Sequence, residues 1–186
     1  STAQSVINAT LVQQAQTGAR VVRLKGGDCG IFGRLDEEIA ALEAANLTYS
    51  ILPGLTAASV AAASIGQSLT RRGRNASLRI VTGHDMAGFA DQDWRGMARL
   101  GEVTAIYMGK KSARFVQGRL MMHGAATDTP VTLVENVSRA DQRVVAATLA
   151  SLPKAAQSLD GPAVILYGLA PRHATPALSQ LKEAQA

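Results

Sequence analysis

A glycine-rich segment near the start of the chain, VVRLKGGDCGIFGR at residues 21–34, has the residue types of a ligand-binding loop. Glycine permits positive φ and carries no side chain, so a ligand can reach main-chain N–H and C=O groups. Asp28 adds an acceptor for a ribose hydroxyl or an amino group. The spacing matches neither a GxGxxG dinucleotide fingerprint nor a Walker A loop. A tight turn whose glycines serve packing only is the alternative interpretation.

Three further places carry residues that could contact a ligand. Thr56 and Ala57 open a helix after a Pro-Gly turn, where backbone donors suit a carboxylate or a polar ligand edge. His84 follows an apolar run and could bind a carboxylate or shuttle a proton. Met108 ends another run and could line an apolar or sulfur-bearing ligand. The plainer alternatives are an N-cap threonine, an exposed loop histidine and a core methionine.

The residue inventory argues against metal and covalent chemistry. The three histidines, His84, His123 and His173, lie far apart without a carboxylate at ligand spacing, so no metal site is predicted. No serine elbow or Cys-His arrangement is present, so covalent catalysis is not predicted either. Cys29 is the single cysteine, which excludes an internal disulfide framework and indicates a reducing, cytoplasmic location.

Helices and strands alternate among the elements that would position these residues. A first helix is expected to end at Gly18, and each of the next apolar runs is followed by a helical pattern. This order predicts an α/β fold with mostly parallel sheets, in which ligands collect beyond the carboxyl ends of strands. A β-like run at residues 142–149 interrupts the order and indicates an antiparallel pair. The other strands are expected at residues 21–24, 49–52, 78–81, 103–108, 131–134 and 163–167.

Composition and charge narrow the class of partner. The 186 residues are 47% hydrophobic and 4% aromatic, which is typical of one globular domain or two small ones. The net charge is +5, but the basic residues are spread along the chain, which favours an anionic small ligand over nucleic acid. The longest apolar stretch, residues 58–66, is too short to span a membrane, so no membrane partner is expected. No signal peptide is recognised.

Five segments together resemble the uroporphyrinogen-III C-methyltransferases of the tetrapyrrole methylase superfamily: VVRLKGGDCGIFGR, ILPGLTAAS, LRIVTGH, AIYMGK and PVTLVENVS. The resemblance extends from about residue 4 to residue 168 in the family's order. It is most specific at residues 21–54. The positions there that match the family pattern are Val21, Leu24, Gly27, Asp28, Phe32, Gly33, Leu42, Ile51, Pro53 and Gly54.

The resemblance implies an enzyme that transfers methyl groups from S-adenosylmethionine to two pyrrole carbons of uroporphyrinogen III. The products would be S-adenosylhomocysteine and precorrin-2, for sirohaem or cobalamin synthesis. It also implies a homodimer of chains with two α/β lobes and a cleft between them. The polar stretch GQSLTRRGRNAS lies between the lobes, which would comprise residues 1–70 and 77–186 with a connection at residues 71–76.

The family's binding residues carry over to matching positions of this chain. Bidentate arginines suit the carboxylates of a tetrapyrrole, so Arg72 is the first substrate-binding candidate and His84 the second. The cofactor contacts implied by the resemblance are Gly26, Gly27, Asp28, Ile31, Thr56, Ala57, Met108 and Val137.

The chain also departs from the family pattern. The family has proline at Cys29, an acid at Gly73 and glycine at Val137, where valine would crowd the adenine side. Family members begin with a strand and a proline-glycine-rich loop, and their proposed acid-base residues lie upstream of the position of Ser1. The resemblance therefore implies a missing N-terminal part, an incomplete first lobe and poor cofactor binding by this chain alone. No catalytic residue is assigned within it.

Three alternative functions stay open at this point. A sister methylase acting on a later corrin intermediate would share the fold and the cofactor. An inactive, truncated pair of lobes would only dimerise or bind tetrapyrrole. A nucleic-acid binder is prompted by the basic composition and the TRRGR motif, which nevertheless lacks a basic helix or interleaved aromatic residues.

Overall fold

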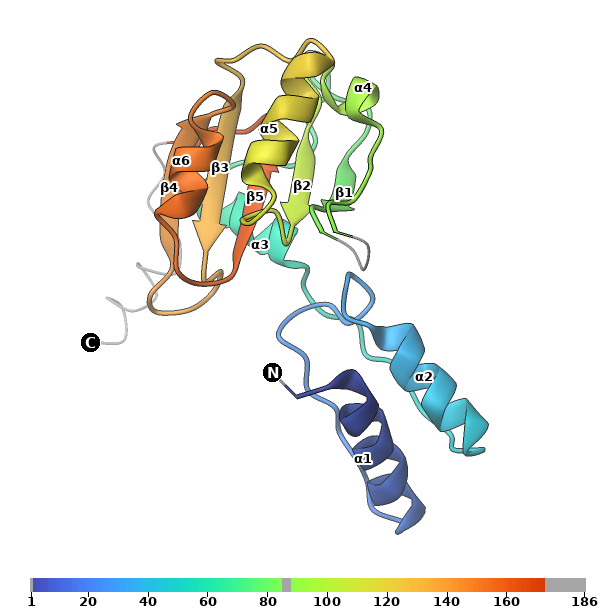
Figure 1. Ribbon diagram of the computed structural model, residues 1–186. Helices are drawn as coiled ribbons and strands as arrows, with labels where there is room; N and C mark the ends of the chain where they lie inside the picture. Colours follow the sequence, from blue (N-terminus) through green and yellow to red (C-terminus); the bar gives the residue numbers. More distant parts are fainter. Residues whose placement is uncertain (1, 85–87, 173–186) are drawn as a thin grey trace, which may run out of the picture. The chain divides into compact units, whose positions relative to one another are not determined.

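A computed structural model of the chain describes residues 2–84 and 88–172 (Figure 1). The chain divides into two compact units, residues 1–56 and residues 57–186. Among the described residues, no helix combines the length and the hydrophobicity that a membrane span requires.

The first unit contains two helices, α1 (Gln4–Gln16) and α2 (Leu35–Ala44). Gly18 follows α1 with φ +83°, as expected for a glycine that ends a helix. The first turn of α2 carries three acidic residues, which the helix dipole favours. One of them, Glu38, is the one buried residue among the described residues of this unit. Polar contacts, and not an apolar core, therefore dominate its interior.

The prediction of strands at residues 21–24 and 49–52 is wrong. Both segments lack regular secondary structure, and their apolar side chains face solvent, with Leu24 80% and Leu52 83% exposed. A β-strand is stabilised by ladder hydrogen bonds to a neighbouring strand, and neither segment has such a partner among the described residues. Apolar, β-branched sequence alone therefore does not make these segments strands.

The second unit is built on one sheet of five strands in the order β1-β2-β5-β3-β4. Each strand lies where the sequence predicts one, and β3 and β4 pair antiparallel, as the 142–149 run indicates. The bounds are β1 (Arg79–Thr82), β2 (Thr104–Tyr107), β3 (Pro130–Glu135), β4 (Arg143–Thr148) and β5 (Ala163–Tyr167).

The prediction of mostly parallel pairing is wrong for this sheet, although its mixed α/β class is confirmed. Of the strand pairs in the described part of the chain, only the pair of β1 and β2 is parallel. β1, β2 and β3 do run in one direction, joined through α4 (Trp94–Met97) and α5 (Ala113–Met122). However, β5 inserts between β2 and β3 in the opposite direction. The β3–β4 connection is also shorter than the dozen or so residues that a parallel crossover needs.

Helices cover both faces of the sheet (Figure 1). The alanine-rich helix α3 (Ala57–Ser64) packs on one face, against residues such as Val164 and Leu166 of β5. Alternate residues of β5, Ile165 and Tyr167, join the core beneath α4, α5 and α6 (Leu152–Gln157) on the other face. Because α3 packs on this sheet and belongs to the second unit, the lobe connection expected at residues 71–76 lies inside that unit.

The carboxyl ends of β1, β2 and β3 share one edge of the sheet, because these three strands run in the same direction. Residues 83–84, 108–110 and 136–138 follow them directly. The segment 159–162, which leads into the opposite strand β5, begins at the same edge. We refer to this as the carboxyl edge.

Candidate functional site

The glycines of the first unit differ in what surrounds them. A Cβ atom on Gly54 would lie 2.9 Å from the carbonyl oxygen of Gly27, so these two backbones need the absence of a side chain to approach. A Cβ on Gly33 would overlap the Cys29 carbonyl. Packing therefore explains Gly33 and Gly54. Gly26 has open space where a side chain would be, with nothing within 4 Å.

Asp28 connects the glycine loop to the Pro-Gly turn. Its Oδ1 accepts the Gly30 N–H at 2.8 Å and its Oδ2 accepts the Gly54 N–H at 3.1 Å. The backbone N–H of Asp28 donates to the carbonyl of Leu55 at 3.0 Å. Both carboxylate oxygens thus brace the backbone, and each keeps a further lone pair that a ligand hydroxyl or amine can use.

The end of the loop turns sharply into α2. Phe32 and Arg34 both have left-handed backbones, with φ +51° and +56°. Ile31, which precedes them, is half-buried. Cys29 directs its thiol towards the carbonyl of Leu52 at 3.8 Å, a weak hydrogen bond that the proline expected by family resemblance could not make. The sulfur therefore adds a second contact between the two loops.

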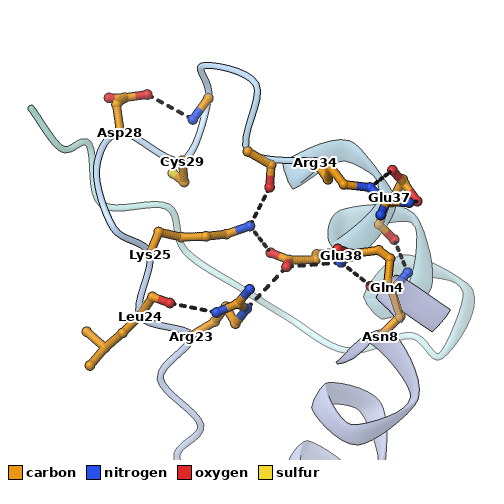
Figure 2. Close-up of polar contacts among 12 residues, drawn as sticks. Gln4, Asn8, Arg23, Leu24, Lys25, Asp28, Cys29, Arg34, Glu37 and Glu38 are labelled. Atoms are coloured by element: carbon orange, nitrogen blue, oxygen red, sulfur yellow. Dashed lines mark hydrogen bonds and ion pairs between the residues drawn. The ribbon is translucent and has the colours of Figure 1, made fainter. Parts of the chain in front are cut away.

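A charged cluster lies at the base of the loop, and the sequence did not reveal it (Figure 2). The ammonium of Lys25 lies 2.8 Å from Glu38 Oε2 and donates to the carbonyl of Gly33 at 2.6 Å. Arg23 Nε and Gln4 Nε2 donate to Glu38 Oε1 at 3.2 and 3.1 Å. In the sequence, the cluster is visible only as three acidic residues in the first turn of a helix. That pattern does not indicate which of the three acids is buried.

The environment of Glu38 favours its ionised form. Burial by itself would raise the pKa of this carboxyl. Hydrogen bonds from Lys25, Gln4 and Arg23, together with the Lys25 charge, outweigh burial and hold the pKa below its ordinary value. Glu38 is therefore a carboxylate at neutral pH, as a buried acid beside two cations must be.

The start of α3 lies beside the carboxyl end of β2 in the second unit. The Ala58 N–H donates to the hydroxyl of Tyr107, the last residue of β2, at 2.9 Å. Met108 follows with φ +51°, and its side chain is 53% exposed. Ala57 begins α3 and is half-buried, as is Thr56, the last residue of the first unit. The tyrosine hydroxyl thus ties the first turn of α3 to the last residue of β2.

Val137 lies on the α3 side of the same sheet edge. It is half-buried and packs, like Tyr107, against the apolar cluster that α3 forms with the sheet. Its neighbours Asn136 and Ser138 have φ of +50° and +68°, whereas Val137 itself does not have a positive φ, so its backbone does not require glycine. Asn136 Oδ1 is buried and has no hydrogen-bond partner among the described residues. Ala57 at the start of α3, Met108 after β2 and Val137 after β3 therefore all belong to the second unit, where β2 and β3 run in the same direction.

A lysine joins the strand ends at the carboxyl edge. Lys110 Nζ donates to the three consecutive carbonyls of residues 159–161, at 2.8 to 3.2 Å. The buried carboxylate of Glu135 accepts the backbone N–H of the last of these residues. The Asn136 N–H donates to the Pro162 carbonyl at 2.9 Å. The segment 159–162 therefore holds the loop after β2 and the loop after β3 in a fixed relation.

Arg72 lies on an exposed turn at residues 71–75. Gly73 occupies the turn with φ +79°, a conformation that would strain the acid expected there by family resemblance. The turn packs against Gly101, which precedes β2. Arg72 is therefore at the amino end of the first strands, opposite the carboxyl edge.

His84 follows the carboxyl end of β1 and is exposed. Its ring meets the edge of Phe89 with the centroids 6.1 Å apart. The structure thus places His84 at the edge that carries Met108 and Val137, and does not bring it together with Arg72. In the described part of the chain, no group of three or more His, Cys, Asp or Glu residues could hold a metal ion.

Comparison with protein families gives one match that covers most of the chain. Residues 1–153 match the family described as Tetrapyrrole (Corrin/Porphyrin) Methylases. The siroheme synthase of Edwardsiella ictaluri is 46% identical over 165 residues, which are 89% of this chain and 36% of that protein. The siroheme synthase of Gluconacetobacter diazotrophicus is 46% identical over 91% of this chain and 37% of its own length. The chain thus spans little more than a third of the curated relatives it matches.

Solved structures give the same fold. A uroporphyrin-III C-methyl transferase from Thermus thermophilus, complexed with S-adenyl homocysteine, matches with a TM-score of 0.76 and 29% identity. That match covers 89% of this chain and 73% of the other. A cobalt precorrin-4 methyltransferase matches with a TM-score of 0.78 at 22% identity, over 87% of this chain and 69% of the other, a likeness of fold.

Proposed function

The chain belongs to the tetrapyrrole methylase family, and from that premise we propose that it is part of a uroporphyrinogen-III C-methyltransferase. The reaction would transfer methyl groups from S-adenosylmethionine to two pyrrole carbons of uroporphyrinogen III, forming precorrin-2. The observation that carries this proposal is the 46% identity to siroheme synthases over 89% of the chain.

The residues present fit a methyl donor of this kind. Gly26 leaves open space beside bare backbone, and the carboxylate of Asp28 retains acceptor capacity for a hydroxyl or amine. In the second unit, Met108 exposes an apolar, sulfur-bearing side chain. The buried oxygen of Asn136, beside Val137, offers an acceptor that is unpaired among the described residues. Each unit therefore offers groups suited to a nucleoside or an amino-acid moiety.

The donor would supply a methyl group already activated on a sulfonium, so the protein need only bind, orient and exclude water. We assign the binding role to eight residues and no acid-base role to any residue of this chain. The hydrogen bonds of the Asp28 carboxylate fix the glycine loop. The hydrogen bonds of the Lys110 ammonium fix the loop after β2. The proposed contacts are Gly26, Gly27, Asp28, Ile31 and Thr56 in the first unit, and Ala57, Met108 and Val137 in the second.

The substrate class follows from charge. Uroporphyrinogen III bears several carboxylates, which guanidinium groups bind in bidentate geometry. Arg72 is exposed on its turn and makes no ion pair among the described residues, so its guanidinium is available to an anion. His84, exposed at the carboxyl edge and so at the opposite end of β1 from Arg72, is the second proposed contact, for a different carboxylate of the substrate.

Calorimetric titration with S-adenosylhomocysteine tests donor binding, and formation of precorrin-2 from uroporphyrinogen III tests the reaction. We expect Arg72→Ala to raise KM for uroporphyrinogen III by roughly tenfold without changing the affinity for S-adenosylhomocysteine. Arg99→Ala is the control, because Arg99 is also exposed in the second unit.

The outcomes separate the proposed function from its alternatives. Methylation of a later corrin intermediate in place of uroporphyrinogen III would point to a sister methylase. Absence of binding heat at high protein concentration would favour a module that only dimerises or binds tetrapyrrole. We also propose a homodimer in the cytoplasm, which sedimentation and cell fractionation would test.

A further inference from the structure

We propose that Lys25, held by the buried carboxylate of Glu38, is a positioning residue that fixes the two ends of the glycine loop at residues 26–33. The inference rests on the proposed function, since that loop is there assigned to the methyl donor. It adds a residue that is not itself expected to touch the ligand.

The position of Lys25 in the chain explains how it can act on the loop. It directly precedes the first residue of the loop, and its ammonium donates to the carbonyl of Gly33, the last residue, at 2.6 Å. The same nitrogen lies 2.8 Å from Glu38 Oε2 on α2 (Figure 2). Opening the loop at its base therefore requires breaking two charge-assisted contacts.

Glu38 is itself held on three sides. Its side chain is only 4% exposed, and Lys25, Arg23 and Gln4 supply the hydrogen bonds that its oxygens need. Asn8 on α1 also donates to the carbonyl of Glu37 at 3.0 Å, so α1 and α2 are joined next to the carboxylate. A buried charge with several partners has a defined position, whereas an exposed ion pair does not. Lys25 is thus anchored to both helices.

The ammonium of Lys25 faces protein acceptors, which argues against direct ligand binding. Its side chain is 14% exposed, and its two partners are a carbonyl and a carboxylate. Asp28 braces the middle of the loop through Gly30 and Gly54, at a separate place. Lys25 therefore controls the base of the loop, and any effect on a ligand passes through the loop backbone.

Four variants of the full chain test this role: Lys25→Met, Lys25→Arg, Glu38→Gln and Glu37→Gln. The first readout is the dissociation constant of S-adenosylhomocysteine, measured well below the unfolding temperature. The second is hydrogen-deuterium exchange of residues 26–33. We expect Lys25→Met to raise the dissociation constant by roughly tenfold and to speed exchange of the loop amides. Lys25→Arg should restore much of both, because a guanidinium can also bridge a carbonyl and a carboxylate.

Glu37→Gln is the matched control for Glu38→Gln. Glu37 is the residue next to Glu38 on α2, and its carboxylate forms an exposed ion pair with Arg34. Because this pair is exposed, its removal should leave binding and loop exchange unchanged. Glu38→Gln should fall between this control and Lys25→Met, because Lys25 then keeps its bond to Gly33. In enzyme carrying Lys25→Met, KM for the methyl donor should rise more than kcat falls, as expected for a positioning role in donor binding.

Wild-type affinity and unchanged loop exchange in Lys25→Met would overturn the inference. If that variant does not fold, equal affinities and equal loop exchange in Glu38→Gln and Glu37→Gln would overturn it instead. A wild-type chain that gives no binding heat with S-adenosylhomocysteine even at high protein concentration would contradict the proposed function. The loop exchange of Lys25→Met would then still decide for or against the role of Lys25.

Discussion

Asp28 shows how a single side chain in this protein combines two roles. The sequence predicts that the Asp28 carboxylate accepts hydrogen bonds from a ligand. The structure shows that each carboxylate oxygen also accepts one backbone N–H, so the side chain holds two loops together. A carboxylate can do both, because each of its oxygens has two acceptor positions. An amide can accept at one atom only.

We therefore predict that Asp28→Asn weakens binding of S-adenosylhomocysteine by roughly tenfold, since one of the two braces must be lost. Titration calorimetry would measure the change. Asp36→Asn is a suitable control, because Asp36 is an exposed acid in the first turn of α2. Equal affinities for the two variants would refute a role for the carboxylate.

Glu38 makes stability depend on pH in a defined direction. Its pKa in the folded chain is lower than the ordinary value of 4.5, so its contribution is complete above that value. The contribution is lost as the pH falls through the lower, folded pKa. The free energy of unfolding should therefore differ most between wild type and Glu38→Gln near neutral pH, and the difference should shrink below about pH 4.5.

Urea unfolding followed by circular dichroism, from about pH 7 to about pH 3, would measure this dependence. Glu37→Gln is the comparison, since the pKa of Glu37 is also lowered, by a hydrogen bond from Arg34, but at an exposed position. Salt should screen the effect of Glu37 and largely spare that of Glu38. A constant difference between wild type and Glu38→Gln at all pH values would disagree with the lowered pKa.

At the scale of elements, Gly168 after β5 and Gly118 within α5 show that the need for glycine depends on backbone conformation and on the space around it. Gly168 closes β5 with φ +84°, and a Cβ there would overlap the carbonyl oxygen of Glu102. Gly118 lies within α5 without a positive φ, and a Cβ there would have nothing within 4 Å. The same substitution should therefore have opposite effects at the two sites.

We predict that Gly168→Ala lowers the free energy of unfolding by more than about 1 kcal/mol, through backbone strain and overlap. Gly118→Ala should raise it by about 0.5 to 1 kcal/mol, because alanine favours the helix and loses less entropy on folding. Urea unfolding of both variants measures these changes. Destabilisation of similar size at both positions would contradict the argument.

Lys110 is the corresponding link between elements at the carboxyl edge. Lys110→Met removes the donor for three carbonyls of residues 159–161 and should cost about 1 to 3 kcal/mol of unfolding free energy. Lys111→Met at the exposed neighbouring position should change it by less than about 0.5 kcal/mol. Equal values for the two variants would show that the carbonyls do not depend on the lysine.

At the scale of the whole molecule, the two units differ in how they are stabilised. The second unit buries apolar side chains on both faces of its sheet. In the described residues of the first unit, Glu38 alone is buried, and several large apolar side chains are exposed. Because apolar burial is the main favourable term in folding, local opening should cost less in the first unit.

Limited proteolysis with a non-specific protease should therefore cut first within residues 2–56. Mass spectrometry should then detect a protected product that contains the strands β1 to β5. Amides of β2, β3 and β5, the inner strands of the sheet, should exchange slowest. Initial cleavage within the sheet would contradict this assignment of stability.

The sequence by itself determined the mixed α/β class, the positions of the five strands and the family, because these follow from local periodicity and from motifs in register. It could not determine pairing: β5 inserts between β2 and β3, and residues 21–24 and 49–52 have no strand partner among the described residues. Partners distant in sequence decide such contacts. For the same reason only the tertiary structure revealed that Lys25, Glu38 and Lys110 hold the loops. A charged residue's role depends on which groups the fold places within hydrogen-bond reach, and the spacing of charges along the chain does not encode that distance.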